Sequence, residues 1–167
     1  MSFLDRILNW EPFFRIRRNH ALEHATLQIL AEKNPMLRMA GYSDANGFWL
    51  IGQVDTAQVR EAAEEALSRL KGGENSLAIH PHCGTNLVTT GFLAGSFAWM
   101  GMPGVGRNMR ERLERLPFII TLVTLAVFLA QPLGPFLQAQ VTTSPATPGM
   151  TLARIERSQR GDVPMHR

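Results

Sequence analysis

Residues 116–137 read LPFIITLVTLAVFLAQPLGPFL and contain no Asp, Glu, Lys or Arg. Phe118–Ala130 is strongly apolar, and together with Pro132–Leu137 it reaches the length of about 20 residues that a membrane-spanning helix needs. Gln131-Pro132 predicts a break or kink near the far end of this helix. The stretch therefore predicts a membrane helix and a protein that needs detergent or lipid.

A second uncharged window, residues 81–106, precedes this stretch. Its apolar part, Leu87–Met102, is short for a straight span and is weakened by three glycines, so a thin span, a re-entrant element and a buried helix all remain open. Gly91 and Gly95 have the spacing that lets another helix approach closely. The sequence thus predicts a membrane-associated helical region over residues 84–138 with one or two spans. Two spans would form a helical hairpin.

The 167 residues carry a net charge of +3, and the pI is about 9.7. Arginines cluster beside the apolar segments, at Arg15, Arg17 and Arg18 and at Arg107, Arg110, Arg112 and Arg115. Anionic lipid headgroups account for such juxtamembrane cations. Because the aromatic residues do not alternate with the basic ones, nucleic acid is excluded as a partner. The expected partners are membrane lipid and either a membrane protein or a second copy of the chain.

The arginines of residues 104–115 predict a cytoplasmic loop between the two apolar segments. With two spans, that loop would place the N-terminal part outside the cell. With one span, the N-terminal part and the loop lie inside and the tail outside. Residues 1–20 are not a signal peptide, because charged residues interrupt their apolar positions. We therefore expect a bacterial cell-membrane protein whose N-terminal domain is cytoplasmic. A hairpin with a cytoplasmic N-terminal domain is also compatible with the sequence, because the loop between the two apolar segments is short.

The predicted organisation has four parts. Residues 1–18 form an amphipathic segment with a short helix that Pro12 ends, lying either on lipid or on the protein's own core. Residues 19–83 form a small α+β domain, residues 84–138 the membrane-associated region, and residues 139–167 a flexible tail rich in Ser, Thr, Pro and Gly.

Within residues 19–83 the fold class is α+β, in the order α-β-β-α-β. Asn19 caps a first helix that Asn34-Pro35 ends, and Asn46-Gly47 marks a hairpin between two strands. Asp55-Thr56 caps a second helix, which Gly72-Gly73 closes. The expected elements are a helix over 20–33, strands over 36–42 and 48–54, a helix over 57–70 and a strand over 76–79.

Four of the five histidines fall into two groups, His20-Ala-Leu-Glu23-His24 and His80-Pro-His82-Cys83. On a helix, His20 and His24 lie one turn apart on one face, the separation that two imidazoles need to share a zinc ion. Glu23 lies on the flank of that face, where its carboxylate can act on an activated water. The first group therefore predicts two metal ligands and a catalytic carboxylate.

The second group can complete such a site. His80 and His82 alternate along an extended segment, so their side chains point the same way. Two ligands from His20 and His24 with one from His80 or His82 make an open, catalytic type of zinc site. A fourth ligand from Cys83 would make it a closed structural site. Residues 84–86 are expected to form a capping turn with outward backbone N–H groups. With one cysteine, the chain forms no internal disulfide.

The H-x-x-E-H motif resembles that of the inverzincin metallopeptidases, over five residues. The resemblance implies His20 and His24 as zinc ligands and Glu23 as general base. In that family a downstream glutamate on a second helix is the third ligand. This chain has three glutamates on its expected second helix, Glu61, Glu64 and Glu65. They lie closer to the motif than the family's spacing, and this domain is much smaller than an inverzincin domain.

The whole chain also resembles a family of small bacterial membrane proteins without an assigned activity. The resemblance rests on N-H-A-L-E-H-A (19–25), H-P-H-C-G-T-N (80–86) and Q-P-L-G-P (131–135). It implies the architecture and no particular reaction.

These observations predict a membrane-anchored zinc-dependent hydrolase that acts on a peptide or amide bond. The alternative is a non-enzymatic membrane accessory or assembly protein with a structural metal site or none. The number of ligands distinguishes the two, because an open three-ligand site favours the enzyme.

Overall fold

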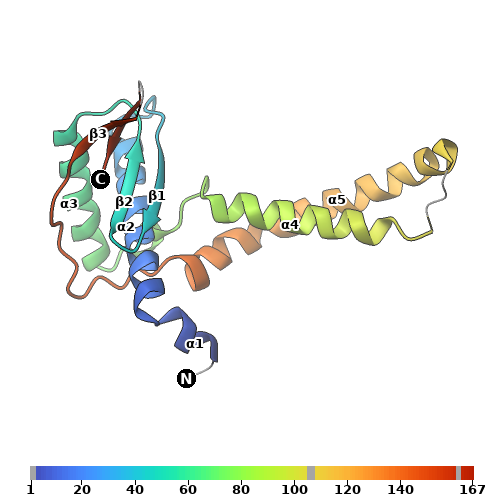
Figure 1. Ribbon diagram of the computed structural model, residues 1–167, viewed down its shortest axis with the longest axis horizontal. Helices are drawn as coiled ribbons and strands as arrows, with labels where there is room; N and C mark the ends of the chain where they lie inside the picture. Colours follow the sequence, from blue (N-terminus) through green and yellow to red (C-terminus); the bar gives the residue numbers. More distant parts are fainter. Residues whose placement is uncertain (1–2, 105–107, 161–162) are drawn as a thin grey trace. The chain divides into compact units, whose positions relative to one another are not determined.

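The computed structural model describes residues 3–104, 108–160 and 163–167, so the predicted loop residue Arg107 lies outside the described residues. The chain divides into two compact units. The α+β unit comprises residues 1–80 and 139–167, and the helical unit comprises residues 81–138 (Figure 1). The mixed helix and sheet content confirms the predicted α+β class.

Two helices open the α+β unit, α1 (Phe3–Leu8) and α2 (Glu11–Lys33). The prediction that Pro12 ends a helix and Asn19 begins the next was wrong. Pro12 lies in the first turn of α2, where its missing N–H costs no helical hydrogen bond. The Asn19 side chain instead donates to the backbone oxygen of Asp44 at 2.8 Å. The histidine motif therefore lies in the middle of a 23-residue helix.

The predicted hairpin is present as β1 (Ala40–Asp44) and β2 (Gly47–Ile51), paired antiparallel. Its turn does not use the positive φ expected of Asn46, because among the described residues only glycines have positive φ. The Asp44 carboxylate accepts from the Asn46 backbone N–H at 2.7 Å instead. This side-chain turn closes the loop.

The sheet has four strands in the order β1-β2-β4-β3. The last two, β3 (Arg157–Arg160) and β4 (Val163–His166), come from the segment predicted to be a flexible tail, so that prediction was wrong for these residues. β4 pairs antiparallel with β2, and Met165 and His166 are buried. Strand pairing and burial of these two side chains outweigh the polar composition of the tail.

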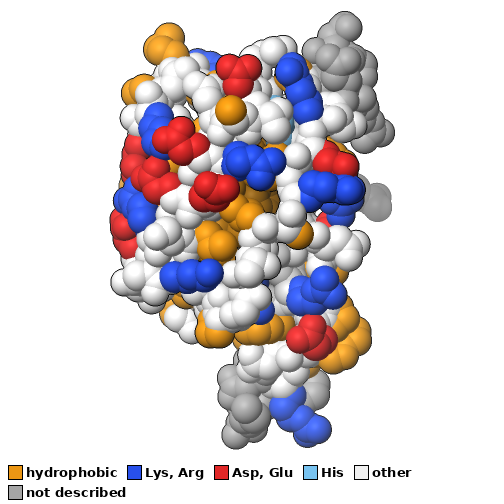
Figure 2. Space-filling model, turned by 90° about the vertical axis from the view of Figure 1, so that its left-hand side faces the viewer, with side chains coloured by type: hydrophobic (Ala, Val, Ile, Leu, Met, Phe, Trp, Pro, Cys, Tyr) orange, Lys and Arg blue, Asp and Glu red, His pale blue; other side chains and the backbone are white. Residues whose placement is uncertain are grey.

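The second predicted helix is α3 (Thr56–Lys71), with the Asp55 capping box at its start and its apolar side buried. The predicted strand over 76–79 was wrong, because this segment forms the 3₁₀ helix η1 (Asn75–Ala78). Side chains of α2 donate hydrogen bonds to the backbone carbonyls of Leu77 and Ala78 in this 3₁₀ helix. The core lies between α2, α3, η1 and β2, and charged side chains surround visible hydrophobic ones on the face shown in Figure 2.

The helical unit consists of α4 (Gly84–Gly101) and α5 (Met109–Leu137), and the π-helix η2 (Gln138–Thr142) follows α5. α5 is longer than the predicted Phe118–Leu137 and continues through three prolines. In the described part of the chain, one helical stretch, Met109–Thr142, is long and apolar enough to cross a membrane.

The two long helices pack antiparallel. Near one end, the Gln138 side-chain amide donates to Asn86 at 2.6 Å, and a Cβ at Gly134 would collide with Asn86. At the other end, a Cβ at Gly101 would lie 3.0 Å from Ile119. Their outer faces expose large apolar side chains, including Phe92, Trp99, Phe128 and Phe136. Such faces fit a lipid environment.

Candidate metal centre

His20 and His24 lie one helical turn apart on α2, and their ring centroids are 4.2 Å apart. Ring nitrogens of the two residues lie within 4.8 Å of one another. His24 is only 2% exposed. The pair therefore has the helical spacing that the motif predicted, in a largely buried place.

Backbone carbonyls hold both rings by the same nitrogen. His20 Nδ1 lies 2.9 Å from the oxygen of Thr142, and His24 Nδ1 lies 2.7 Å from that of Ala78. A carbonyl oxygen only accepts, so each Nδ1 carries the proton. In the neutral ring, Nε2 is then the basic nitrogen. Zinc-binding histidines show this arrangement, because the bond at one nitrogen fixes the ring and makes the other a better ligand.

His80 lies beside this pair, with its ring centroid 5.5 Å from that of His24. The Gln28 side-chain amide donates to the carbonyls of Leu77 and Ile79, at 2.8 and 2.9 Å. These bonds and the bond from His24 to Ala78 fix the segment that carries His80 against α2. One histidine of the second group thus lies beside His24 of the first.

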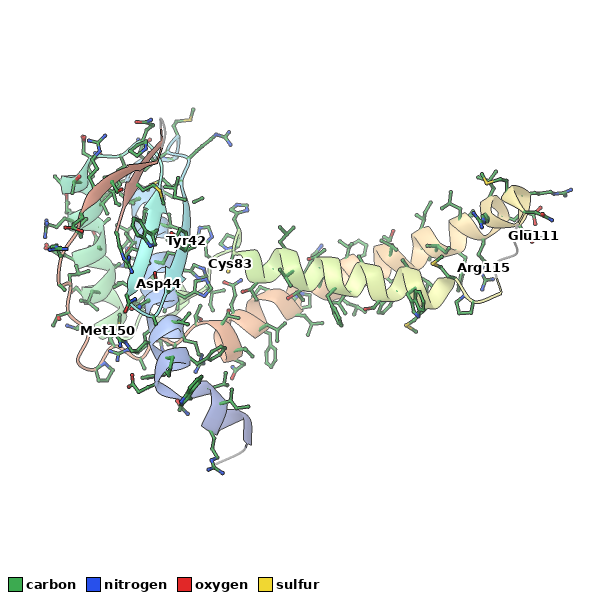
Figure 3. All side chains as sticks on the ribbon, in the orientation of Figure 1. Tyr42, Asp44, Cys83, Glu111, Arg115 and Met150 are labelled. Atoms are coloured by element: carbon green, nitrogen blue, oxygen red, sulfur yellow. The ribbon has the colours of Figure 1, made fainter. Side chains whose placement is uncertain are left out.

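His82 and Cys83 belong to the helical unit. His82 is exposed in the turn before α4. Cys83, labelled in Figure 3, is the N-cap residue of α4. Its sulfur accepts from the Thr85 backbone N–H at 3.4 Å. Residues 84–86 form the first turn of that helix.

Glu23 is buried and faces β1. Its Oε2 accepts from the Ser43 hydroxyl at 2.5 Å, and a Cβ built on Gly41 would lie 2.5 Å from its Oε1. The missing side chain of Gly41 thus leaves space for the Glu23 carboxylate. A fixed orientation for Glu23 follows from these contacts.

The glutamates that the inverzincin resemblance offered as third ligands have other surroundings. Glu61 and Glu65 each lie 2.9 Å from the ammonium group of Lys33, at the end of α2. The hydrogen bond from Lys33 lowers the pKa of the Glu65 carboxyl. Glu64 is exposed. Within the α+β unit, the histidine of the second group that lies beside His24 is His80.

Sequence reasoning missed four groups around the centre. They are the carbonyls of Thr142 and Ala78 and the side chains of Gln28 and Ser43. Backbone acceptors leave no signal in a sequence. Gln28 did leave one, since it is a polar residue one turn beyond His24 on the same helical face.

A model of a domain of unknown function (DUF6391) matches residues 15–155. The chain belongs to this family. It is 34% identical over 154 residues to an uncharacterized protein of Picosynechococcus sp. (strain PCC 7002), SYNPCC7002_A1392, which covers 84% of this chain and 72% of that protein. No solved structure matches the chain.

Proposed function

We propose that the protein is a membrane-anchored, zinc-dependent hydrolase of peptide or amide bonds. The observation that carries the metal site is the common arrangement of His20 and His24, each donating Nδ1–H to a backbone carbonyl. Fixed, neutral imidazoles with basic Nε2 atoms suit zinc. The membrane anchor is supported by the apolar stretch Met109–Thr142.

The proposed ligands are His20, His24 and His80, with His82 or Cys83 as further candidates. The first three support an imidazole site, because they belong to one unit and the rings of His20 and His80 each lie beside that of His24, with centroids 4.2 and 5.5 Å away. Zinc would supply Lewis acidity, activating a water molecule and polarising the substrate carbonyl.

Glu23 is the proposed proton acceptor. Its fixed carboxylate is adjacent in sequence to His24, and Ser43 holds its orientation. A general base needs such a defined position within reach of the water that it deprotonates.

A second candidate function is a non-enzymatic membrane accessory or assembly protein with a structural metal. The packing of Glu23 against Ser43 and Gly41 favours it, since that packing also gives the carboxylate a structural role. Four protein ligands, Cys83 among them, would make the site closed and structural.

The testing experiment is elemental analysis of the detergent-purified protein after growth with added zinc. We expect stoichiometric zinc in the wild type and loss of most of it in His24→Ala. Thr26→Ala is the matched control, because Thr26 is a fully buried residue of the same helix whose hydroxyl bonds to Leu22. A metal-free wild type, or unchanged metal in His24→Ala, would contradict the metal site.

We further propose that the protein resides in the bacterial cell membrane with residues 19–83 in the cytoplasm. An unbiased screen of peptide and amide substrates with the zinc-loaded protein follows the metal analysis. Turnover that Glu23→Gln abolishes would favour the hydrolase over the accessory protein.

A further inference from the structure

The first two helices form a bend whose apolar side chains are not covered by the α+β unit. Trp10, at the junction of α1 and α2, is 65% exposed, and Ile7 and Phe13 are also exposed. We call residues 6–18 the N-terminal elbow. The sequence left open whether this segment lies on the protein's own core or on lipid, and the exposure of Trp10 argues against the core.

Basic side chains share this elbow with the aromatic ones. Residues 1–18 contain four arginines and two acidic residues. Arg6 and Arg15 are exposed, and the Arg18 guanidinium lies 5.5 Å from the centre of the Phe14 ring. Hydrophobic and basic side chains lie together in the lower part of Figure 2. Tryptophan and arginine in one surface segment are typical of a membrane interface.

Arg17 fixes the elbow to the chain just beyond α5. Its guanidinium donates to the Leu8 carbonyl at 3.2 Å and to the carbonyls of Gln140 and Thr143 at 3.0 Å each. Arg17 is only 9% exposed, and its backbone oxygen accepts from the Ser144 N–H at 3.0 Å. A buried cation with several carbonyl partners is a rigid connection, because each bond lost would leave charge unsolvated.

Gln140 belongs to the same helical stretch, Met109–Thr142, that is apolar enough to span a membrane, and Thr143 follows it directly. Where this stretch leaves the hydrocarbon region, residues 140–144 must lie near the lipid headgroups. Arg17 therefore holds the elbow at that depth, and His20, bonded to Thr142, lies one turn further along α2.

We infer that the N-terminal elbow is an interfacial anchor that binds the surface of an anionic lipid bilayer through Trp10, Phe13, Arg6 and Arg15. This inference rests on the membrane anchoring in the proposed function and is independent of the metal. It gives the hydrolase a substrate class: peptide or amide bonds presented at the level of the headgroups, because α2 carries both the elbow and the histidine pair.

Fluorescence in reconstituted nanodiscs tests the anchor with the full chain. The protein has three tryptophans, so Trp49→Phe with Trp99→Phe leaves Trp10 as the reporter, and Trp10→Phe with Trp99→Phe leaves Trp49 on the sheet as the matched control. In discs that contain phosphatidylglycerol, we expect blue-shifted Trp10 emission and quenching by lipids brominated near the headgroup, several-fold stronger than that of Trp49.

Charge reversal tests the role of the arginines. Arg6→Glu with Arg15→Glu should weaken the quenching of Trp10 at least twofold in anionic discs and little in zwitterionic ones. Arg38→Glu with Arg60→Glu changes the charge equally at exposed positions outside the elbow and should leave the quenching unchanged.

Three results would overturn the inference, and they differ from one another. Solvent-like Trp10 emission in protein that floats with lipid would contradict the elbow alone. Blue-shifted emission without bromine quenching would show that protein, such as a second copy, covers Trp10. Failure of the wild type to float with vesicles would contradict the membrane anchoring itself, while zinc analysis would still report separately on the metal centre.

Discussion

His20 and His24 each donate a hydrogen bond from Nδ1 to a backbone carbonyl, and this bond fixes the orientation of the ring. The basic nitrogen of each neutral ring is then Nε2. The sequence could supply the spacing of the two residues but not this choice of nitrogen. Thr142, whose carbonyl fixes His20, is 122 positions away along the chain. Its contribution is a backbone atom, so no residue type reveals it. The spacing of the histidine pair was predictable, and the groups that orient the two rings were not.

Glu23→Gln separates the two proposed functions at the level of one residue. Glutamine keeps the size of the side chain and an acceptor oxygen for Ser43 but is not a base. We expect metal content close to that of the wild type and loss of turnover, measured by elemental analysis and by the substrate screen. Loss of metal as complete as in His24→Ala would make Glu23 a ligand and contradict its role as base.

Gly41→Ala is the companion variant. The new Cβ would lie 2.5 Å from Glu23 Oε1, so the carboxylate must move while the histidines keep their partners. We expect retained zinc with reduced turnover. Unchanged turnover would show that the position of Glu23 does not matter for catalysis.

His166 predicts how stability depends on pH. It is buried, its Nε2–H donates to the Val54 carbonyl at 3.0 Å, and Arg157 and Asp55 are its charged neighbours. Burial lowers the pKa of His166 below its usual 6.5, with Arg157 adding to the effect and the Val54 bond and Asp55 opposing it.

Because the unfolded chain binds this proton more readily than the folded one, the contribution of neutral His166 is complete above a pH of about 6.5 and decreases as the pH falls toward the folded-state pKa. Melting temperatures measured from pH 8 to pH 5 should therefore fall less steeply in His166→Gln than in the wild type. The other histidines are present in both proteins, so parallel curves would contradict this assignment.

At the scale of elements, local signals predicted α3 and the β1–β2 hairpin. The Asp55 cap and the apolar side of α3 leave a clear pattern, and Asn46-Gly47 marks the hairpin. Elements that depend on distant partners were missed. The segment 75–78 is helical with its carbonyls bonded to α2, and β3 and β4 exist because β2 offers an unpaired edge. Neither partner can be inferred from the segment itself.

Met165→Ala tests whether β4 is an integral part of the sheet. Met165 is 8% exposed and is paired with Ile51, so its truncation should lower the free energy of unfolding by about 2–5 kcal/mol. Met36→Ala, at a position that is 88% exposed, should change it by less than about 0.5 kcal/mol. Denaturant titration of both variants in detergent measures the difference. Equal stability would mean that β4 contributes nothing to the core.

For the whole molecule, the sheet constrains the membrane topology that the sequence left open. β2, from the first part of the chain, pairs with β4 from the last, so both parts lie on the same side of any membrane. The arrangement with one span and the tail outside is therefore excluded. If α5 crosses once, the chain between β2 and β4 must cross a second time, and we propose α4 as that second span. At 18 residues α4 is about 27 Å long, close to the roughly 30 Å of a hydrocarbon core.

With two spans, we expect Asn108, at the start of α5, to lie across the membrane from the α+β unit. Single cysteines at Asn108, Arg38 and Arg154, each in a Cys83→Ser background, can be labelled with an impermeant maleimide in intact and in permeabilised cells. We expect Arg38→Cys and Arg154→Cys to react alike and Asn108→Cys to react oppositely. With a cytoplasmic α+β unit, only Asn108→Cys is labelled in intact cells.

Opposite labelling of Arg38→Cys and Arg154→Cys would contradict the sheet, because a β2–β4 pair cannot form across a bilayer. Identical labelling of all three positions would instead show that the two helices do not cross, and that their exposed apolar faces are covered in another way.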